Sequence, residues 1–437
     1  MKNYVKYIRK TLDMLIHDLS EHIDEFCYDS KRNFTRKRKL PPETLLTILV
    51  GMGGDPLRNE LLKYWNYTPE LATVPAFVQQ RSKLKPLALE TLFRHFVSKT
   101  VTPKLYCGYR LLAADGSDLQ FPTNPKDPDS YVPASEKKSH FSLMHLSALF
   151  DLNTGLYLDA IAQKTRLSNE NAALVEMVDR SDITDPVIVI ADRNYEAYNT
   201  IAHIQEKGWN YLIRLRDYKG IISKVNLPNT LEFDLTVDVN LTRKQTKEMR
   251  ALMLDNPCAF RFLPSTARFD YLPLKSSELY PLSFRIVRFP IGADSFETII
   301  TNLDATRFPP EKLQKLYAMR WGIETSFRQL KQTVGLRMFQ AKKVEHIIQE
   351  IFARLIMYNF TESITSHVVI RNADRKYAYQ ANFSAAVHIC RQFIRGDVSP
   401  PQVEALILKF LTPIRPGRNE PRKTNRIRFT GFYYRIA

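Results

Sequence analysis

Two short apolar segments, each ending in an aspartate, constrain the fold of this chain most strongly. They are Tyr109–Asp115 and Pro186–Asp192, and the second is rich in β-branched residues. Short apolar runs of this kind predict buried strands. Because side chains that follow the carboxyl ends of strands often form the active sites of α/β sheets, Asp115 and Asp192 are candidate site residues at one sheet edge.

The segments around these two runs alternate between strand and helix patterns. His140–Asp151 and Gly155–Gln163 predict two strands joined by a turn at Asn153-Thr-Gly155. Helices are predicted at about 168–180 and 196–207, and a further strand at Tyr211–Leu215. We therefore predict an α/β fold in which helices flank a mixed sheet.

The stretch 218–295 interrupts this alternation. Apolar and polar residues alternate strictly from Leu231 to Leu241, which predicts a half-buried antiparallel strand, and Ser283–Ile291 predicts another. A strand at Phe296–Asn302 follows, and Pro309-Pro310 begins a long helix. We interpret 218–295 as a mostly β insertion that separates 106–217 from 296–345.

Both ends of the chain are predicted to be helical, over 1–105 and 346–437. The basic segment KRNFTRKRK (31–39) favours a DNA-binding headpiece and a packed helical cap equally. The tail from 411 carries many arginines and one acid, Glu420. It suggests an arm along a nucleic-acid backbone, with a disordered solubilising tail as the alternative.

One helical segment carries four polar residues on a common face. Tyr317, Arg320, Glu324 and Lys331 are spaced by three, four and seven residues, which correspond to about one, one and two helical turns. An acid among three donors on one face indicates a carboxylate next to a phosphate-binding surface.

Three acids from separate segments could form one metal site. Magnesium and manganese prefer hard oxygen ligands, and two such ions can promote an in-line phosphoryl displacement. Asp115, Asp192 and Glu324 are the expected ligand set. Taken singly, each aspartate could be a cap or turn residue and Glu324 a surface acid. Asp118 is the alternative to Asp115, which we prefer because it directly ends the apolar run.

The composition favours a folded protein with a polyanionic partner. The net charge is +17 with a pI near 9.5, which is typical of binding to phosphate backbones. The four cysteines are far apart and form no zinc-ribbon spacing. No apolar run of about 18 residues exists, so we expect a cytoplasmic protein with no membrane association.

These motifs resemble those of the IS4-type DDE transposases of bacteria. The spacing Tyr-x2-Arg-x3-Glu-x6-Lys matches their signature, Asp115-Gly-Ser resembles their first acidic block, and Asp192-Arg-Asn-Tyr-Glu resembles the second, where a glycine often replaces Asn194. The likeness covers roughly 108–345. It implies a ribonuclease-H-like core, bound Mg²⁺ or Mn²⁺ (two ions), and a homodimer on double-stranded transposon ends and target DNA.

The resemblance also implies cut-and-paste transposition of an insertion sequence through strand cleavage, a hairpin and strand transfer. DNA contacts are expected from Tyr317, Arg320, Lys331 and Arg193. Phe296 and Trp321 are candidates for holding a flipped base, although both could be core residues. The alternatives are a nuclease or domesticated recombinase of the same fold and a catalytically inactive DNA-binding regulator.

Overall fold

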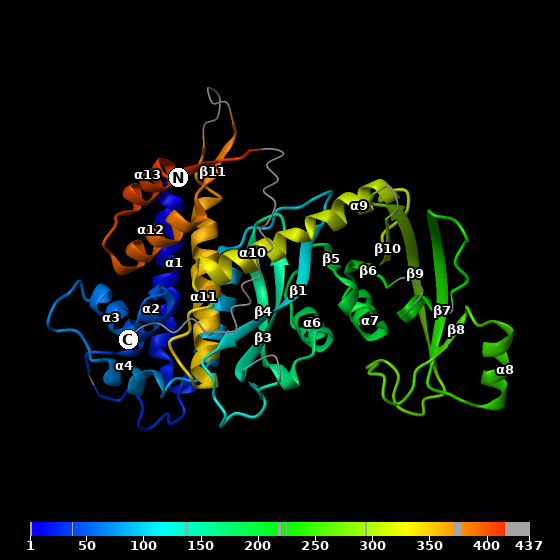
Figure 1. The fold of residues 1–437 in the computed structure, drawn as a ribbon, viewed down its shortest axis with the longest axis horizontal. Helices are drawn as coiled ribbons and strands as arrows, with labels where there is room; N and C mark the ends of the chain where they lie inside the picture. Colours follow the sequence, from blue (N-terminus) through cyan, green and yellow to red (C-terminus); the bar gives the residue numbers. More distant parts are fainter. Residues whose placement is uncertain are drawn as a thin grey trace.

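A computed structural model describes residues 2–36, 38–135, 139–216, 220–223, 225–292, 295–370 and 377–415. The molecule is elongated, with a helical bundle at one end, a sheet with its helices in the middle and the insertion at the other end (Figure 1). The part of the tail predicted as a basic arm that follows Arg415 lies outside the described residues, as does Lys37 of the basic segment. Within the described chain, no helix is both long and apolar enough to span a membrane.

The helices from the two ends of the chain form a single bundle around α11 (Figure 1). In α1 the apolar residues at helical spacing, from Val5 to Leu19, are buried, as the pattern predicts. The N-terminal helices α1, α2 and α5 therefore pack against the C-terminal helices. The helices of the bundle are α1 (Lys2–Glu21), α2 (Pro42–Gly51), α3 (Leu57–Tyr64), α4 (Val74–Arg81), α5 (Leu87–Thr100), α11 (Val344–Thr365), α12 (Phe383–Arg395) and α13 (Pro400–Lys409), with a short turn of 3-10 helix η1 (Ile23–Phe26) and a small pair β11 (Tyr379–Ala381) and β12 (Leu411–Pro413).

The central sheet begins with three antiparallel strands and continues with two strands parallel to the first. Its order is β4-β3-β1-β5-β6, with β2 pairing on the far part of β3. This arrangement confirms the predicted mixed, ribonuclease-H-like sheet. The strands are β1 (Arg110–Phe121), β2 (Tyr131–Val132), β3 (Phe141–Asp151), β4 (Leu156–Lys164), β5 (Val187–Ala191) and β6 (Asn210–Arg214).

Helices cover both faces of this sheet. On one face, α6 (Glu170–Asp179) and α7 (Tyr198–Glu206) pack against alternate residues of the strands, including Leu112 and Ala114 of β1. On the other face, Leu111 and Ala113 pack toward the helices that follow the insertion. Short 3-10 turns, η2 (Thr165–Leu167) and η3 (Arg193–Tyr195), precede α6 and α7.

The insertion extends the central sheet instead of forming a separate layer. Beyond β6 the order continues as β10-β9-β7-β8, in which β7, β8 and β9 belong to the insertion and β10 is the strand that follows it. The sheet thus contains ten strands in the described residues. The predicted alternating strand is present, and its burial increases from an exposed Leu231 to a fully buried Leu241. The elements are η4 (Gly220–Ile222), β7 (Phe233–Thr242), α8 (Lys247–Asp255), β8 (Phe260–Phe262), β9 (Leu279–Pro290) and β10 (Phe296–Thr301).

The long helix after the insertion is divided at Arg320 into α9 (Pro310–Met319) and α10 (Trp321–Gln332). Arg320 keeps helical dihedrals, and the amide of Arg320 donates to the carbonyl of Tyr317 three residues earlier, so the chain tightens there without turning away. A Cβ at Gly322 would lie 2.9 Å from Leu152. The absence of a side chain at Gly322 therefore lets α10 approach the turn between β3 and β4.

Candidate functional site

The two candidate aspartates lie side by side at the edge of the parallel strands. Ala114 of β1 pairs with Ala191 of β5, and Asp115 and Asp192 are the next residues on each strand path. Alternation along β1 places Asp115 on the face of Leu111 and Ala113, which α9 and α10 cover. The edge predicted from the sequence is therefore present.

The expected end of the first strand at Asp115 is wrong. β1 continues to Phe121, and from Asp115 onward it pairs with β3 but no longer with β5. Its apolar residues Leu119 and Phe121 remain buried, which stabilises the extension. Asp115 is thus fixed inside a continuous strand, whereas Asp192 begins a 3-10 turn and caps it by accepting a hydrogen bond from the amide of Asn194 at 2.8 Å.

Burial and neighbouring acids hold a proton on Asp115 more tightly than usual. Desolvation raises the pKa of Asp115 to about 6, and the carboxylates of Asp192 and Glu324 add to the rise. The Gly116 amide, which donates to Asp115 Oδ1 at 2.8 Å, and the Arg320 guanidinium oppose it. This site therefore favours an additional positive charge near Asp115.

Arg320 supplies such a charge between two of the acids. Its Nη2 donates to Glu324 Oε1 at 2.9 Å, and its Nη1 is 4.0 Å from Asp115 Oδ2. The Arg320 side chain is 9% exposed, and its Nε has no hydrogen-bond partner among the described residues. Arg320 therefore acts in this structure as an internal counterion, and a direct phosphate contact by Arg320 stays a prediction.

Asp118, the alternative to Asp115, lies on the opposite face of β1. Its Oδ1 is 2.9 Å from Nδ1 of His145 on β3, and this contact lowers the pKa of Asp118. The other ring nitrogen of His145 is 3.1 Å from Glu170 of α6. Asp118 therefore belongs to an ion-pair network behind the strand, and the geometry favours Asp115 as the site residue.

The other residues of the helical motif have different surroundings. Tyr317 is 4% exposed, and its hydroxyl has no hydrogen-bond partner in the described part of the chain; burial raises the pKa of this hydroxyl to about 12. Lys331 Nζ donates to the backbone carbonyl of Asp118 at 2.8 Å, and burial lowers its pKa. Trp321 is 61% exposed, with the Arg320 guanidinium 5.2 Å from its ring centre. Trp321 is thus not a core residue.

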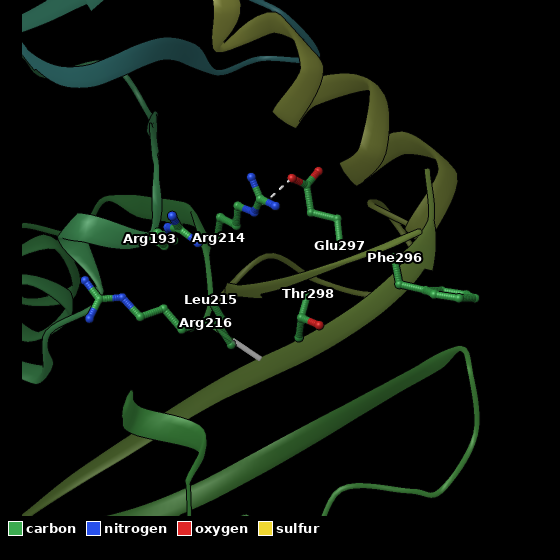
Figure 2. Close-up of a pocket in the computed structure, with 7 residues that line it drawn as sticks. All are labelled: Arg193, Arg214, Leu215, Arg216, Phe296, Glu297 and Thr298. Atoms are coloured by element: carbon green, nitrogen blue, oxygen red, sulfur yellow. Dashed lines mark ion pairs between the residues drawn. The ribbon is translucent and has the colours of Figure 1, made fainter. Parts of the chain in front are cut away.

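An arginine-rich cavity of about 260 Å³ lies beside this motif (Figure 2). Arg193 follows Asp192 directly, and Arg214 and Arg216 come from the end of β6. Arg214 Nε is 3.2 Å from Glu297 Oε1. Glu297 and Arg214, which line the cavity, lie close enough to Tyr317 of α9 to influence the pKa of its hydroxyl. The cavity therefore adjoins α9. Its lining residues are Arg193, Arg214, Leu215, Arg216, Phe296, Glu297 and Thr298.

The sequence reasoning missed Arg214 and Arg216 as site residues. A usable signal was present, because both residues stand at the end of a predicted strand parallel to those that precede Asp115 and Asp192. Strand ends of this kind meet at one sheet edge. The pairing of β10 with β6, which brings Phe296 and Glu297 to that edge, depends on the insertion and has no local sequence signal.

The three acids are of the kind that bind a divalent metal ion, but in this structure their carboxylates do not converge on a single point. Three carboxylates suit Mg²⁺ or Mn²⁺, and burial raises the pKa of Asp115, with a smaller contribution from the carboxylates of Asp192 and Glu324. Among the described residues, however, no group of three or more His, Cys, Asp or Glu side chains stands ready to hold a metal ion. The guanidinium of Arg320 lies between Asp115 and Glu324.

Comparison with known proteins gives the same assignment as the geometry. Residues 106–360 match the family model of the transposase DDE domain. Transposase InsG for insertion sequence element IS4 of Escherichia coli (strain K12) is 23% identical over 378 residues, which is 82% of this chain and 77% of that protein. The piggyBac transposase in a synaptic complex with hairpin DNA aligns with 94% of this chain and 87% of its own, at 10% identity and a TM-score of 0.47.

The family match spans more than half of the chain and contains both strand-end aspartates, the insertion and the helical motif. Together with the IS4 relative, it confirms the resemblance to the IS4-type transposases. The alternatives of a nuclease or domesticated recombinase of the same fold and of a catalytically inactive DNA-binding regulator are not favoured. The chain belongs to the family of transposases with a DDE domain, enzymes that bind DNA and use divalent metal ions to cleave and transfer its strands.

Proposed function

We propose that this enzyme moves an IS4-type insertion sequence by cut-and-paste transposition, with Asp115, Asp192 and Glu324 as its catalytic acids. The observation that carries the assignment is the pairing of Ala114 with Ala191, which aligns the two aspartates on the face from which Glu324 approaches. The resemblance to IS4-type transposases supports the choice of element, and the family supports the chemistry.

The three acids would hold a pair of Mg²⁺ or Mn²⁺ ions between them, because such ions prefer hard oxygen ligands and two of them can share a set of carboxylates. Ions held by Asp115, Asp192 and Glu324 would supply activation of a water or 3′-hydroxyl and stabilisation of the leaving oxygen in an in-line displacement. Arg320, which spans Asp115 and Glu324, would exchange one of these contacts for a DNA phosphate once the acids have another cation.

The arginine-rich cavity would hold the DNA backbone next to the acids. Arg193 and Arg216 offer planar donors suited to phosphate oxygens. Phe296 is among the residues that line the cavity, although its ring points away from the arginines (Figure 2) and has the Arg288 guanidinium 5.2 Å from its centre. After turning toward the cavity, this ring would offer a stacking surface for a flipped base during hairpin formation. We assign this role to Phe296 ahead of Trp321, because Trp321 lies outside the residues that line the cavity.

A nicking assay on DNA that carries the ends of the element tests the proposal. Asp115→Asn, Asp192→Asn and Glu324→Gln should each abolish Mg²⁺-dependent cleavage while gel-shift binding stays near the wild-type level, because each removes a metal ligand and no phosphate donor. Glu311→Gln, an exposed acid in the first turn of α9, is the matched control and should cleave normally. Cleavage by Glu324→Gln at the wild-type rate would show that Glu324 has a structural role.

The reaction type and the assembly need two further measurements. Strand-transfer products with a target plasmid distinguish a transposase from a nuclease, which would stop at cleavage. Light scattering of the purified complex with end DNA tests the homodimer, since a dimer bound to two ends has twice the mass of a monomer bound to one.

A further inference from the structure

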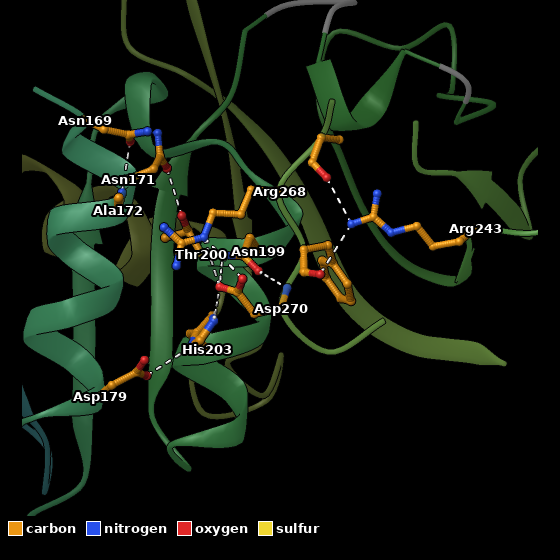
Figure 3. A network of polar contacts seen from close by, with 12 residues as sticks. Asn169, Asn171, Ala172, Asp179, Asn199, Thr200, His203, Arg243, Arg268 and Asp270 are labelled. Carbon is orange, nitrogen blue, oxygen red and sulfur yellow. Dashed lines mark hydrogen bonds and ion pairs between the residues drawn. The ribbon is translucent and has the colours of Figure 1, made fainter. Parts of the chain in front are cut away.

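Two consecutive residues at the start of α6, Glu170 and Asn171, each contact a segment that carries one of the candidate aspartates. Asn171 Nδ2 donates to the backbone carbonyl of Asn194 at 2.8 Å. Asn171 Oδ1 accepts a hydrogen bond from Thr200 of α7, also at 2.8 Å (Figure 3). The amide group of Asn171 is thus held in one orientation, with its donor directed at the turn after Asp192.

The residue that Asn171 holds is also the residue that orients Asp192. The amide of Asn194 donates to Asp192 Oδ1 at 2.8 Å, while its carbonyl accepts from Asn171. Fixing the Asn194 carbonyl limits rotation of this 3-10 turn, and therefore limits the direction of the N–H group that meets the carboxylate. Asn171 acts on Asp192 through one intervening residue.

Glu170 acts on Asp115 in a similar way. Its Oε1 lies 3.1 Å from His145 Nε2, and together these side chains cover Gly116. A Cβ at Gly116 would lie 2.3 Å from His145 Nε2 and 2.5 Å from Glu170 Oε1, so no side chain fits there without displacing the pair. The amide of Gly116 donates to Asp115 Oδ1 at 2.8 Å. Glu170 and His145 therefore hold the strand at the residue that orients Asp115.

We propose that Glu170 and Asn171 are positioning residues that set the two aspartates for metal binding. The proposal rests on the assignment of Asp115 and Asp192 as metal ligands. Both aspartates use the same device, in which a neighbouring backbone N–H fixes one carboxylate oxygen and the start of α6 fixes that neighbour. Neither Glu170 nor Asn171 takes part in the chemistry. The start of α6 thereby couples the geometry of the two acids across β1 and β5.

Direct binding of Mn²⁺, followed by the electron paramagnetic resonance of the free ion, tests the role of Asn171 without any DNA. Asn171→Leu removes both hydrogen bonds of the amide, of which only the bond to the Asn194 carbonyl reaches the turn at Asp192. The variant should raise the Mn²⁺ dissociation constant about three- to ten-fold, the effect of losing that one hydrogen bond. Thr200→Val is the matched control. It removes only the bond from Thr200 to Asn171, leaves the donor to Asn194 in place and should bind Mn²⁺ within about two-fold of wild type.

A second pair of variants on α6 tests Glu170. This pair keeps the proposal testable if Asn171→Leu does not fold. Glu170→Ala should weaken Mn²⁺ binding, whereas Glu176→Ala, whose exposed side chain pairs with Arg180, should not. Melting temperatures of all four variants show whether weakened binding accompanies an intact fold. Wild-type Mn²⁺ affinity in both Asn171→Leu and Glu170→Ala would overturn the proposal.

Asp192→Asn and Asp115→Asn distinguish this result from a failure of the site assignment. If these two variants bind Mn²⁺ as the wild type does, the acids are not the metal ligands and the proposed site is wrong. If they lose binding while Asn171→Leu and Glu170→Ala keep it, the site stands and the positioning role is wrong. The site assignment and the positioning role are both supported if the two aspartate variants, Asn171→Leu and Glu170→Ala all bind Mn²⁺ more weakly than the wild type. Thr200→Val and Glu176→Ala must then bind it normally.

Discussion

Arg320 donates a hydrogen bond to Glu324 across one turn of helix, with 2.9 Å between Nη2 and Oε1. The same guanidinium is 4.0 Å from Asp115 Oδ2. Arg320 thus joins two candidate metal ligands that come from a helix and a strand. Under the proposed assignment of these acids as metal ligands, Arg320 competes with the metal for the same carboxylates, and the competition can be measured.

Arg320→Met should make the protein more responsive to metal. Without metal, the variant leaves two partly buried carboxylates without their shared cation, which should cost about 1–3 kcal/mol and lower the melting temperature. Added Mg²⁺ should then raise the melting temperature of the variant more than that of the wild type, because no guanidinium has to be displaced.

Thermal melts in EDTA and in MgCl₂ measure this difference. Arg328→Met, an exposed arginine of the same helix, is the matched control and should respond to Mg²⁺ as the wild type does. An equal Mg²⁺ response in Arg320→Met and the wild type would show that Arg320 does not compete with metal.

The arginines of the cavity should contribute separately to DNA affinity. Arg193→Ala and Arg216→Ala should each reduce the slope of log affinity against log salt by up to about one unit, because each removes a cation that displaces a counterion from phosphate. Binding of end DNA between low and moderate salt gives the slope. Arg250→Ala, in α8 at the far end of the insertion (Figure 1), should leave it unchanged. A wild-type slope in both Arg193→Ala and Arg216→Ala would place the DNA away from the cavity.

The sequence predicted the parts of this site that depend on local patterns. The β-branched run before Asp192 specifies a buried strand wherever it packs, and Pro309-Pro310 specifies the start of the helix that carries Glu324. The extension of β1 beyond Asp115 was missed because Gly116 has the appearance of a turn residue, whereas here its missing side chain makes room for His145 and Glu170.

Contacts between distant segments could not be predicted in this way. The ion pair between Arg214 and Glu297 joins residues from strands on either side of the insertion. The i, i+4 spacing allows Arg320 to pair with Glu324 within one helix. The approach of Arg320 to Asp115, in contrast, depends on how closely α10 packs on β1. Such contacts follow from the tertiary fold, which a single sequence does not reveal.

Phe296 and Trp321 should differ in their effect on hairpin formation. Phe296→Leu removes the aromatic ring beside the cavity and should reduce the yield of hairpin ends about ten-fold, since base stacking on an aromatic ring contributes about 1–3 kcal/mol. Nicking of the first strand should continue. Trp321→Leu should have the smaller effect, because Trp321 does not line the cavity. Gels that resolve nicked and hairpin products decide between the residues, and the reverse order would assign the stacking role to Trp321.

Glu362 of α11 should make the stability of the fold depend on pH. Burial raises the pKa of its carboxyl to about 7 from the ordinary 4.5, and the hydrogen bond from Thr365 only partly offsets this rise. Below pH 4.5 the carboxyl is protonated in both the folded and the unfolded chain, so it has no effect. Between pH 4.5 and 7 the unfolded chain loses the proton while the folded chain keeps it, so stability falls as pH rises, by at most about 3 kcal/mol. Above pH 7 the loss is complete.

Glu362→Gln is neutral at every pH and should lack this decline, so its melting temperature relative to wild type should increase from pH 4.5 to pH 8. Glu345→Gln, an exposed acid in the first turn of the same helix, is the control and should follow the wild-type curve. The melts are recorded across this pH range in a metal-free buffer, so that metal binding by Asp115, Asp192 and Glu324 does not change the melting temperature. Parallel curves for Glu362→Gln and the wild type would mean that Glu362 is ionised in the folded protein. In that case its charge must be compensated by a neighbour, for which Lys104 is the candidate, since this lysine lowers the pKa of Glu362.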